Sequence, residues 1–228
     1  MARSTVWAAL IVLGLALPAA AQVPPSASEI AAYRGLHAAA AKGDVGSIEK
    51  LAAAGDAIDA RDGQGRTPLH VAAFLRQPAA ASALVLRGAN PNALEGQKYD
   101  IVTIASVAND VPMLKLALEL GGKATNITSP YDGTALIAAA HLGHDEVVRT
   151  LIAAKAPLDH VNNLGWTALI ESIVLGDGGK RHVACLEALV KAGANVNLAD
   201  RGGSTPLTLA RRRGFTAMET ILVAAGAK

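Results

Sequence analysis

Apolar residues along the chain fall in short runs at helical spacing, separated by turns that contain glycine. Leu69, Ala72 and Ala73 are three and four positions apart, so on a helix they would share one face. A second stripe of the same kind follows Gly143 and consists of Val147, Val148, Leu151 and Ile152. The pattern predicts pairs of short amphipathic helices joined by tight turns.

The helix pairs recur with a nearly constant period. The stretch 65–73 reads G-R-T-P-L-H-V-A-A, and shortened versions of it follow along the chain. The residues at the place of its threonine are Thr67, Asp100, Thr134, Thr167 and Thr205, with spacings of 33, 34, 33 and 38. The glycines that follow the second helix are Gly55, Gly88, Gly121, Gly193 and Gly226. Two anchors with one period predict six repeats, at about 34–60, 61–93, 94–127, 128–160, 161–198 and 199–228.

Each repeat carries the signals that start and stop helices. Thr67 can cap a helix with its hydroxyl, and Pro68 fits the first turn, where its missing N–H is not needed. Asp100 stands in the place of the threonine and is expected to cap the third repeat. Gly193 is expected to end the second helix of the fifth repeat. A single helix pair cannot bury its own apolar face, so the repeats are expected to stack.

The fifth repeat carries about five extra residues between its helices. Residues 176–181 read G-D-G-G-K-R, and we expect them to form a mobile loop. The stretch contains no Gly-Lys-Ser/Thr sequence and follows no strand, so it does not indicate a phosphate-binding loop.

These motifs resemble those of ankyrin repeats. The matching residues are T-P-L-H at 67–70, the Gly143-His144 pair between helices and the ending G-A-N-V-N at 193–197. The resemblance covers residues 34–228. It implies an all-α ankyrin repeat solenoid of about six helix-turn-helix repeats with short hairpin loops. It also implies that His37 and His70 bond neighbouring backbone at repeat junctions, and that the domain is a non-catalytic protein–protein interaction module.

The first 21 residues have the pattern of a secretory signal peptide. Arg3 is followed by an apolar run at 6–17, a proline, and the small residues Ala19, Ala20 and Ala21. The run has 12 residues, whereas a membrane-spanning helix needs about 20, so we expect no stable membrane insertion after cleavage. The alternative is an uncleaved anchor. Residues 22–33 are expected to be a linker and the start of the first helix, opened by Ser28. The alanine bias is typical of bacteria, so we expect a secreted protein, located in the bacterial periplasm.

Composition and charge limit the function classes. The chain is 51% hydrophobic but only 3% aromatic, which favours tightly stacked helices with small side chains. Its formal net charge of +2 argues against a dedicated nucleic-acid binder. The single cysteine, Cys185, cannot form an internal disulfide, and we interpret it as a small buried apolar residue.

No catalytic set is recognisable, so we predict that the chain is not an enzyme and needs no cofactor. His141 and His144 are three apart and beside Asp145, a spacing that could hold a metal on one helix. Gly143 lies between them at the expected turn, so we predict no metal site. An enzyme or metal protein that uses these two histidines is the alternative from another class.

The resemblance implies a concave binding face built from the hairpin tips and the first helix of each repeat. The predicted contact residues are Arg66, Phe74, Gln97, Tyr99, Tyr131, His141, Leu164 and Trp166. Four of the six aromatic residues after position 21 are among them, and aromatic and arginine side chains anchor many protein interfaces. The alternative is that a bulky residue before the threonine only packs against the next hairpin.

We therefore predict a periplasmic module that binds another protein through the concave face of repeats two to five. We expect it to be a monomer. The alternative roles are an inhibitor or immunity-type protein and an accessory factor for an envelope enzyme.

Overall fold

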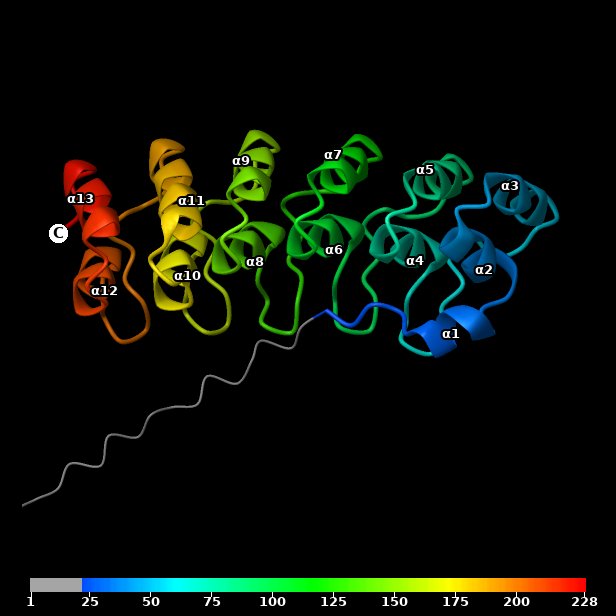
Figure 1. Cartoon of the computed structure of the whole chain (residues 1–228), viewed down its shortest axis with the longest axis horizontal. Helices are drawn as coiled ribbons and strands as arrows, with labels where there is room; N and C mark the ends of the chain where they lie inside the picture. Colours follow the sequence, from blue (N-terminus) through cyan, green and yellow to red (C-terminus); the bar gives the residue numbers. More distant parts are fainter. Residues whose placement is uncertain (1–21) are drawn as a thin grey trace, which may run out of the picture.

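A computed structural model describes residues 22–228, so the predicted signal peptide at 1–21 lies outside the described residues. Within the described part the chain forms thirteen α-helices, and its single β-bridge joins Thr128 to Gly133. The predicted all-α class is confirmed. Figure 1 shows the helices as a row of stacked pairs, with α1 apart from the row near its N-terminal end.

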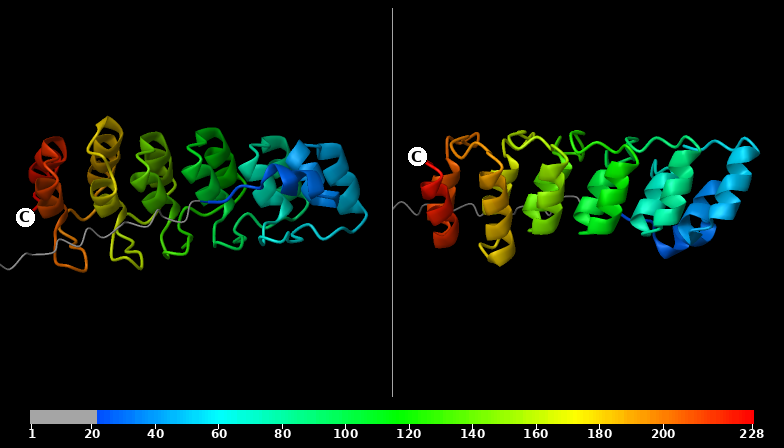
Figure 2. Two further views of the ribbon diagram at one scale, coloured as in Figure 1. Left: turned by 60° about the horizontal axis from the view of Figure 1, so that its bottom comes forward. Right: turned by 90° about the horizontal axis from the view of Figure 1, so that it is seen from above.

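Each predicted repeat range holds one inner and one outer helix. The inner helices are α2 (Gly35–Lys42), α4 (Pro68–Phe74), α6 (Ile101–Val107), α8 (Ala135–His141), α10 (Ala168–Val174) and α12 (Pro206–Arg212). The outer helices are α3 (Val45–Ala53), α5 (Pro78–Leu86), α7 (Val111–Glu119), α9 (Asp145–Ala153), α11 (Lys180–Lys191) and α13 (Thr216–Ala224). The short helix α1 spans Ala27–Ala32. Figure 2 shows that the connections between repeats project to one side as a row of hairpins.

The inner helices begin where the sequence predicts. Side chains at the anchor position cap α4, α6, α8, α10 and α12 by accepting the N–H three residues on, and these residues are Thr67, Asp100, Thr134, Thr167 and Thr205. The exception is α2, where Arg34 makes no side-chain cap. Gly193, just after α11, has φ +94°, a left-handed conformation in which a side chain would be strained.

One acceptor side chain shapes each hairpin. In five hairpins in succession, one side-chain oxygen accepts hydrogen bonds from the backbone N–H groups two and four residues further along the chain. The accepting residues are Asp62, Glu95, Ser129, Asn162 and Asp200. Hairpins also bond to each other directly. The Gly96 N–H, for example, donates to the Gln64 carbonyl at 2.9 Å. Four residue types serve at this position, which explains why the hairpins repeat in shape more closely than in sequence.

Polar contacts between repeats complement the apolar core. His37 and His70 donate through Nε2 to the backbone oxygens of Arg66 and Ala93, both at 2.9 Å, as the resemblance implied. A second ladder runs along the turns after the outer helices. There the N–H groups of residues 90, 123, 195 and 228 donate to Asp59, Asn92, Asp159 and Asn197 of the preceding repeat. Stacking therefore satisfies backbone groups as well as burying apolar faces.

The N-terminal segment differs from its prediction. The cap is Ser26 rather than Ser28, because the Ser26 hydroxyl accepts the Glu29 N–H while the Glu29 carboxylate accepts the Ser26 N–H at 2.7 Å. This reciprocal pair starts a helix two residues earlier. The helix ends at Ala32, so α1 is separate from the first inner helix instead of being its start.

The extra residues of the fifth repeat, 176–181, also differ from the predicted mobile loop. Lys180 and Arg181 belong to α11. The remaining residues are held in place by Arg213, whose guanidinium donates to the Gly176 carbonyl at 2.9 Å and lies over the Phe215 ring. A Cβ on Gly178 would lie 2.4 Å from that ring. The prediction of a loop over the whole stretch is therefore wrong for its last two residues.

Cys185 lies fully buried on α11, and burial raises the pKa of its thiol to about 12. Because the thiolate is the reactive form, we expect the folded protein to resist a thiol reagent such as dithionitrobenzoate and the unfolded protein to react fully. Absorbance of the released thionitrobenzoate measures both. Rapid stoichiometric reaction in native buffer would contradict the burial.

No helix among residues 22–228 has the length and apolar character that crossing a membrane requires.

Candidate protein-binding face

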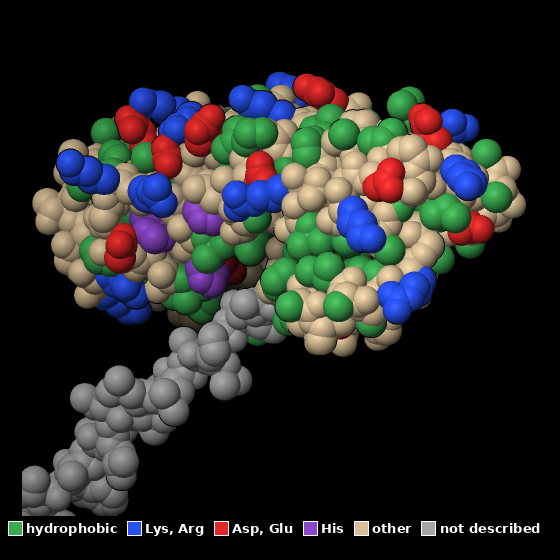
Figure 3. Space-filling view, turned by 45° about the vertical axis from the view of Figure 1, so that its right-hand side comes forward, with side chains coloured by type: hydrophobic (Ala, Val, Ile, Leu, Met, Phe, Trp, Pro, Cys, Tyr) green, Lys and Arg blue, Asp and Glu red, His purple; other side chains and the backbone are tan. Residues whose placement is uncertain are grey.

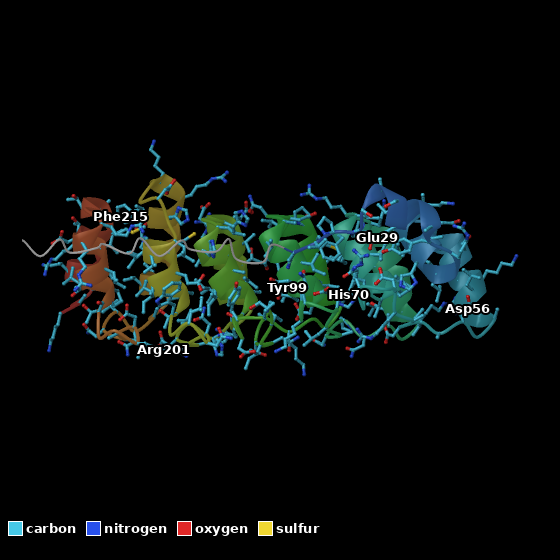
Figure 4. All side chains as sticks on the ribbon, turned by 90° about the horizontal axis from the view of Figure 1, so that it is seen from below. Glu29, Asp56, His70, Tyr99, Arg201 and Phe215 are labelled. Carbon is cyan, nitrogen blue, oxygen red and sulfur yellow. The ribbon has the colours of Figure 1, made fainter. Side chains whose placement is uncertain are left out.

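The concave face is the surface that the inner helices and the hairpins form together, seen from below in Figure 4. Three positions on this side can be compared between repeats, namely the residue before the helix cap and the fourth and seventh residues after it. In the second repeat these are Arg66, Val71 and Phe74. The eight predicted contact residues lie on or beside these positions, but the structure gives them different surroundings.

Arg66 and Tyr99 are not available as surface contacts, which corrects their prediction. Their exposed fractions are 1% and 5%. Arg66 is enclosed because its guanidinium is ion-paired with Asp62 at 2.7 Å and with Glu29 of α1. Burial comes first among the causes that raise the pKa of the Tyr99 phenol. The N-terminal segment, whose position the repeat pattern does not determine, covers Arg66 through Val23 and Glu29.

The other six predicted residues keep some exposure. Leu164, at a hairpin tip, is 40% exposed. The partly exposed ones are Phe74, Gln97, Tyr131, His141 and Trp166. Phe74 also packs against the core, as the alternative interpretation expected of bulky residues. The accessible aromatic side chains of repeats four and five are thus Tyr131 and Trp166.

Repeat five also holds a buried carboxylate that sequence reasoning missed. Glu171 is 4% exposed and occupies the fourth position after the cap. One of its oxygens accepts from Asn162 Nδ2 at 2.7 Å, and the other lies 3.3 Å from His141 Nδ1. The equivalent residues in the other five repeats are all apolar, and they are Ala38, Val71, Ile104, Ala138 and Leu209. That break in an apolar column is the sequence signal that could have revealed Glu171.

His141 and His144 do not act together. His141 faces Glu171 from the end of α8, whereas His144 donates through Nδ1 to the Ser106 carbonyl of the preceding repeat at 3.0 Å. Burial lowers the pKa of His144, so it is neutral at pH 7. Among the described residues no three His, Cys, Asp or Glu side chains are grouped so that they could hold a metal ion.

Charged side chains of the two signs are interspersed on the side shown in Figure 3, rather than gathered by sign. The arginine triplet near the C-terminus is engaged within the chain. Arg211 pairs with Glu219 at 2.8 Å, Arg212 donates to the Ser204 hydroxyl at 3.0 Å, and Arg213 binds backbone carbonyls. These contacts give the triplet a structural role at the end of the stack.

A solenoid of helix pairs with capped inner helices and a partly open concave face defines a helical repeat scaffold. The profile described as "Ankyrin repeats (3 copies)" matches residues 102–200, and that of the single ankyrin repeat matches 64–95. The chain is 34% identical over 190 residues to the ankyrin repeat protein YahD of Escherichia coli K12, covering 83% of this chain and 94% of that protein. It therefore belongs to the ankyrin repeat family.

Solved structures show the same architecture. An ankyrin repeat domain of Acinetobacter baumannii is 44% identical, with a TM-score of 0.80, over 85% of this chain and 98% of that one. A chain in the complex of the Bdellovibrio bacteriovorus endopeptidase Bd0816 with its immunity protein Bd3460 is 22% identical, with a TM-score of 0.69, over 84% and 98%. The second likeness shows the fold alone.

Proposed function

We propose that this chain is an exported, non-catalytic module that binds a partner protein through the open part of its concave face, in repeats four and five. The observation that carries the proposal is the group of Glu171, His141 and Trp166. The Glu171 carboxylate occupies a repeat position that is apolar in the other repeats, and it lies beside the partly exposed His141 ring. Burying a charge is costly and needs hydrogen-bonding partners, which suggests a role beyond stacking.

The geometry orients His141 toward an incoming group. Its Nδ1 faces the Glu171 carboxylate and donates toward it, which leaves Nε2 free to meet a group of the partner. A hydrogen-bonding group of the partner at Nε2 would complete the arrangement, while Trp166 and Tyr131 supply aromatic contact area.

Export is supported by the sequence of residues 1–21, which has the charged, apolar and small-residue parts of a signal peptide. The proposed destination is the bacterial periplasm.

Replacing both Trp166 and Tyr131 by alanine is expected to weaken partner binding at least 30-fold, because aromatic anchors at interfaces contribute about 2 kcal/mol or more to the binding free energy. The partner is first captured from a periplasmic extract of the native organism and identified by mass spectrometry, and its affinity is then measured by calorimetry. Circular dichroism and the melting temperature should not change. Leu86→Ala is the control, because Leu86 is 83% exposed on an outer helix. An unchanged affinity in the double variant would refute this face as the binding site.

An inhibitor or immunity-type role is the second candidate, and a chain from an enzyme–immunity complex has the same fold. The same capture experiment separates the roles. An inhibitor would bring down a hydrolase whose activity falls when the purified chain is added. An accessory factor or scaffold would leave that activity unchanged or raise it.

A further inference from the structure

Residues 22–33, which we call the N-terminal strap, lie against the concave face. They run extended to Ser26 and then form α1. Figures 1 and 4 show the described chain beginning beneath α6 and passing α4 toward α2. Pro25, in the extended part, is buried. The printed contacts of the strap lie on repeats one and two, at His37, Asp62 and Arg66, so the strap covers this part of the face.

Arg66 is the main anchor of the strap. Among the described residues it is the one Lys or Arg side chain that is buried, at 1% exposed. Its Nε donates to Asp62 at 2.7 Å, its Nη2 pairs with Glu29 of the strap, and its Nη1 lies 3.4 Å from the Val23 carbonyl. One carboxylate thus comes from the repeat itself and the other from the strap. Such charge-assisted contacts are stronger and more specific than neutral hydrogen bonds.

A second anchor lies at the other end of the strap. The Tyr33 hydroxyl donates to Asp62 Oδ2 at 2.7 Å, and its ring centroid is 5.3 Å from that of His37. Between the anchors, the reciprocal bonds of Ser26 and Glu29 fix the start of α1. These bonds and Arg66 lower the pKa of the Glu29 carboxyl, so the anchoring charge is present at neutral pH.

We propose that the concave face of repeats one and two is a recognition groove for an acidic, extended peptide segment, filled in cis by the strap. The groove supplies a buried guanidinium whose Nε pairs with Asp62 of the repeat, which leaves Nη2 to pair with Glu29 of the strap. A partner segment with a carboxylate at the same place, after an extended stretch, has the chemistry to replace the strap. This site is separate from the open face of repeats four and five and does not depend on its function.

Covalent attachment explains why the groove is closed in the intact chain. A tethered segment is present at an effective concentration on the order of millimolar, so a free peptide of equal intrinsic affinity competes poorly. Weakening the strap should therefore open the groove to the same sequence added in trans.

The experiment uses the chain from residue 22 with Glu29→Lys, which turns the anchoring charge against Arg66. The probe is a fluorescent peptide of residues 22–33, QVPPSASEIAAY, followed by anisotropy. The expected results are strap amides that exchange hydrogen at least tenfold faster and a peptide that binds the variant but not the unaltered chain. The same peptide with Glu29→Gln should bind at least tenfold more weakly, since a charged hydrogen bond contributes about 1.5–3 kcal/mol.

Glu49→Lys is the matched control, because Glu49 is an exposed acidic residue on α3 and pairs with Arg87 only at 3.8 Å. It should behave as the unaltered chain does. Strap amides that stay equally protected in Glu29→Lys, no peptide binding up to millimolar concentration, or equal binding of both peptides would each overturn the proposal. If Glu29→Lys does not fold, Glu29→Gln in the chain takes its place, because it removes the charge without adding another.

Discussion

Leu136→Ala is expected to lower the free energy of unfolding by about 3 kcal/mol, because it removes a fully buried side chain from the middle of the stack. Leu136 has no exposed surface and lies on α8, which packs against α6, α9 and α10. The cavity would weaken two repeat interfaces as well as the helix pair itself. Since each repeat contacts only its neighbours, we also expect unfolding to become less cooperative.

Urea denaturation followed by circular dichroism measures both effects. The midpoint of the transition reports the stability, and its steepness reports the cooperativity. The control is Leu142→Ala, one residue beyond the same helix and 40% exposed, which should change stability by less than about 1 kcal/mol. A midpoint for Leu136→Ala equal to that of the control would contradict the packing of α8.

Acidification from pH 6.5 to about 4 is expected to remove roughly 3 kcal/mol of unfolding free energy through His70 alone. Burial lowers the pKa of His70 to about 4, although its Nε2–H bonds to the Ala93 and Tyr99 carbonyls act in the opposite direction. The neutral ring also fits its neighbours, because Nδ1 accepts the Thr67 N–H at 3.1 Å and would lose that bond on protonation.

The sign follows from which state binds the proton. Between pH 6.5 and 4 the unfolded chain protonates His70 while the folded chain does not, so protons favour unfolding. The contribution is complete above pH 6.5 and is lost as the pH falls toward the folded pKa. Carboxyl groups with lowered pKa values, such as those of Asp44 and Asp177, add their loss only at lower pH. Burial raises the pKa of the Glu95 carboxyl, so its protonation offsets part of the loss, and comparison with a His70 variant isolates the histidine effect.

Urea titrations at half-unit intervals of pH test this expectation. His70→Gln should be less stable than the unaltered chain at pH 7.5, and its free energy of unfolding should depend less steeply on pH. The free energy of unfolding of Leu142→Ala should change with pH as steeply as that of the unaltered chain. A His70→Gln slope as steep as that of the unaltered chain would show that another group dominates. His144, whose pKa burial also lowers, is the first to replace in that case.

The repeat architecture follows from the sequence because its signals are local. Thr67 and Asp100 cap helices through bonds to residues three positions away, and Gly193 ends α11 through its own φ angle. Such interactions depend on neighbours along the chain, so the period, the helix starts and the buried stripes were predictable. The family comparison agrees with them.

The binding face was less predictable, because exposure depends on what lies above each side chain. Arg66, Tyr99 and Trp166 share one position in the repeat, and their sequence context does not distinguish them. Only the tertiary structure shows the first two buried while Trp166 stays partly exposed.

The sequence by itself determined an ankyrin solenoid of six helix pairs and the set of positions from which its face is built. The tertiary structure decided how that face is divided. Twelve residues before the repeats carry no repeat signal, yet their Glu29 pairs with Arg66, 37 positions further along the chain, and covers this part of the face. Elsewhere the face stays open around Glu171, whose partners are Asn162 of the same repeat and His141 of the preceding repeat. Contacts between residues so far apart depend on the packing of the whole stack, and no local pattern along the chain specifies them.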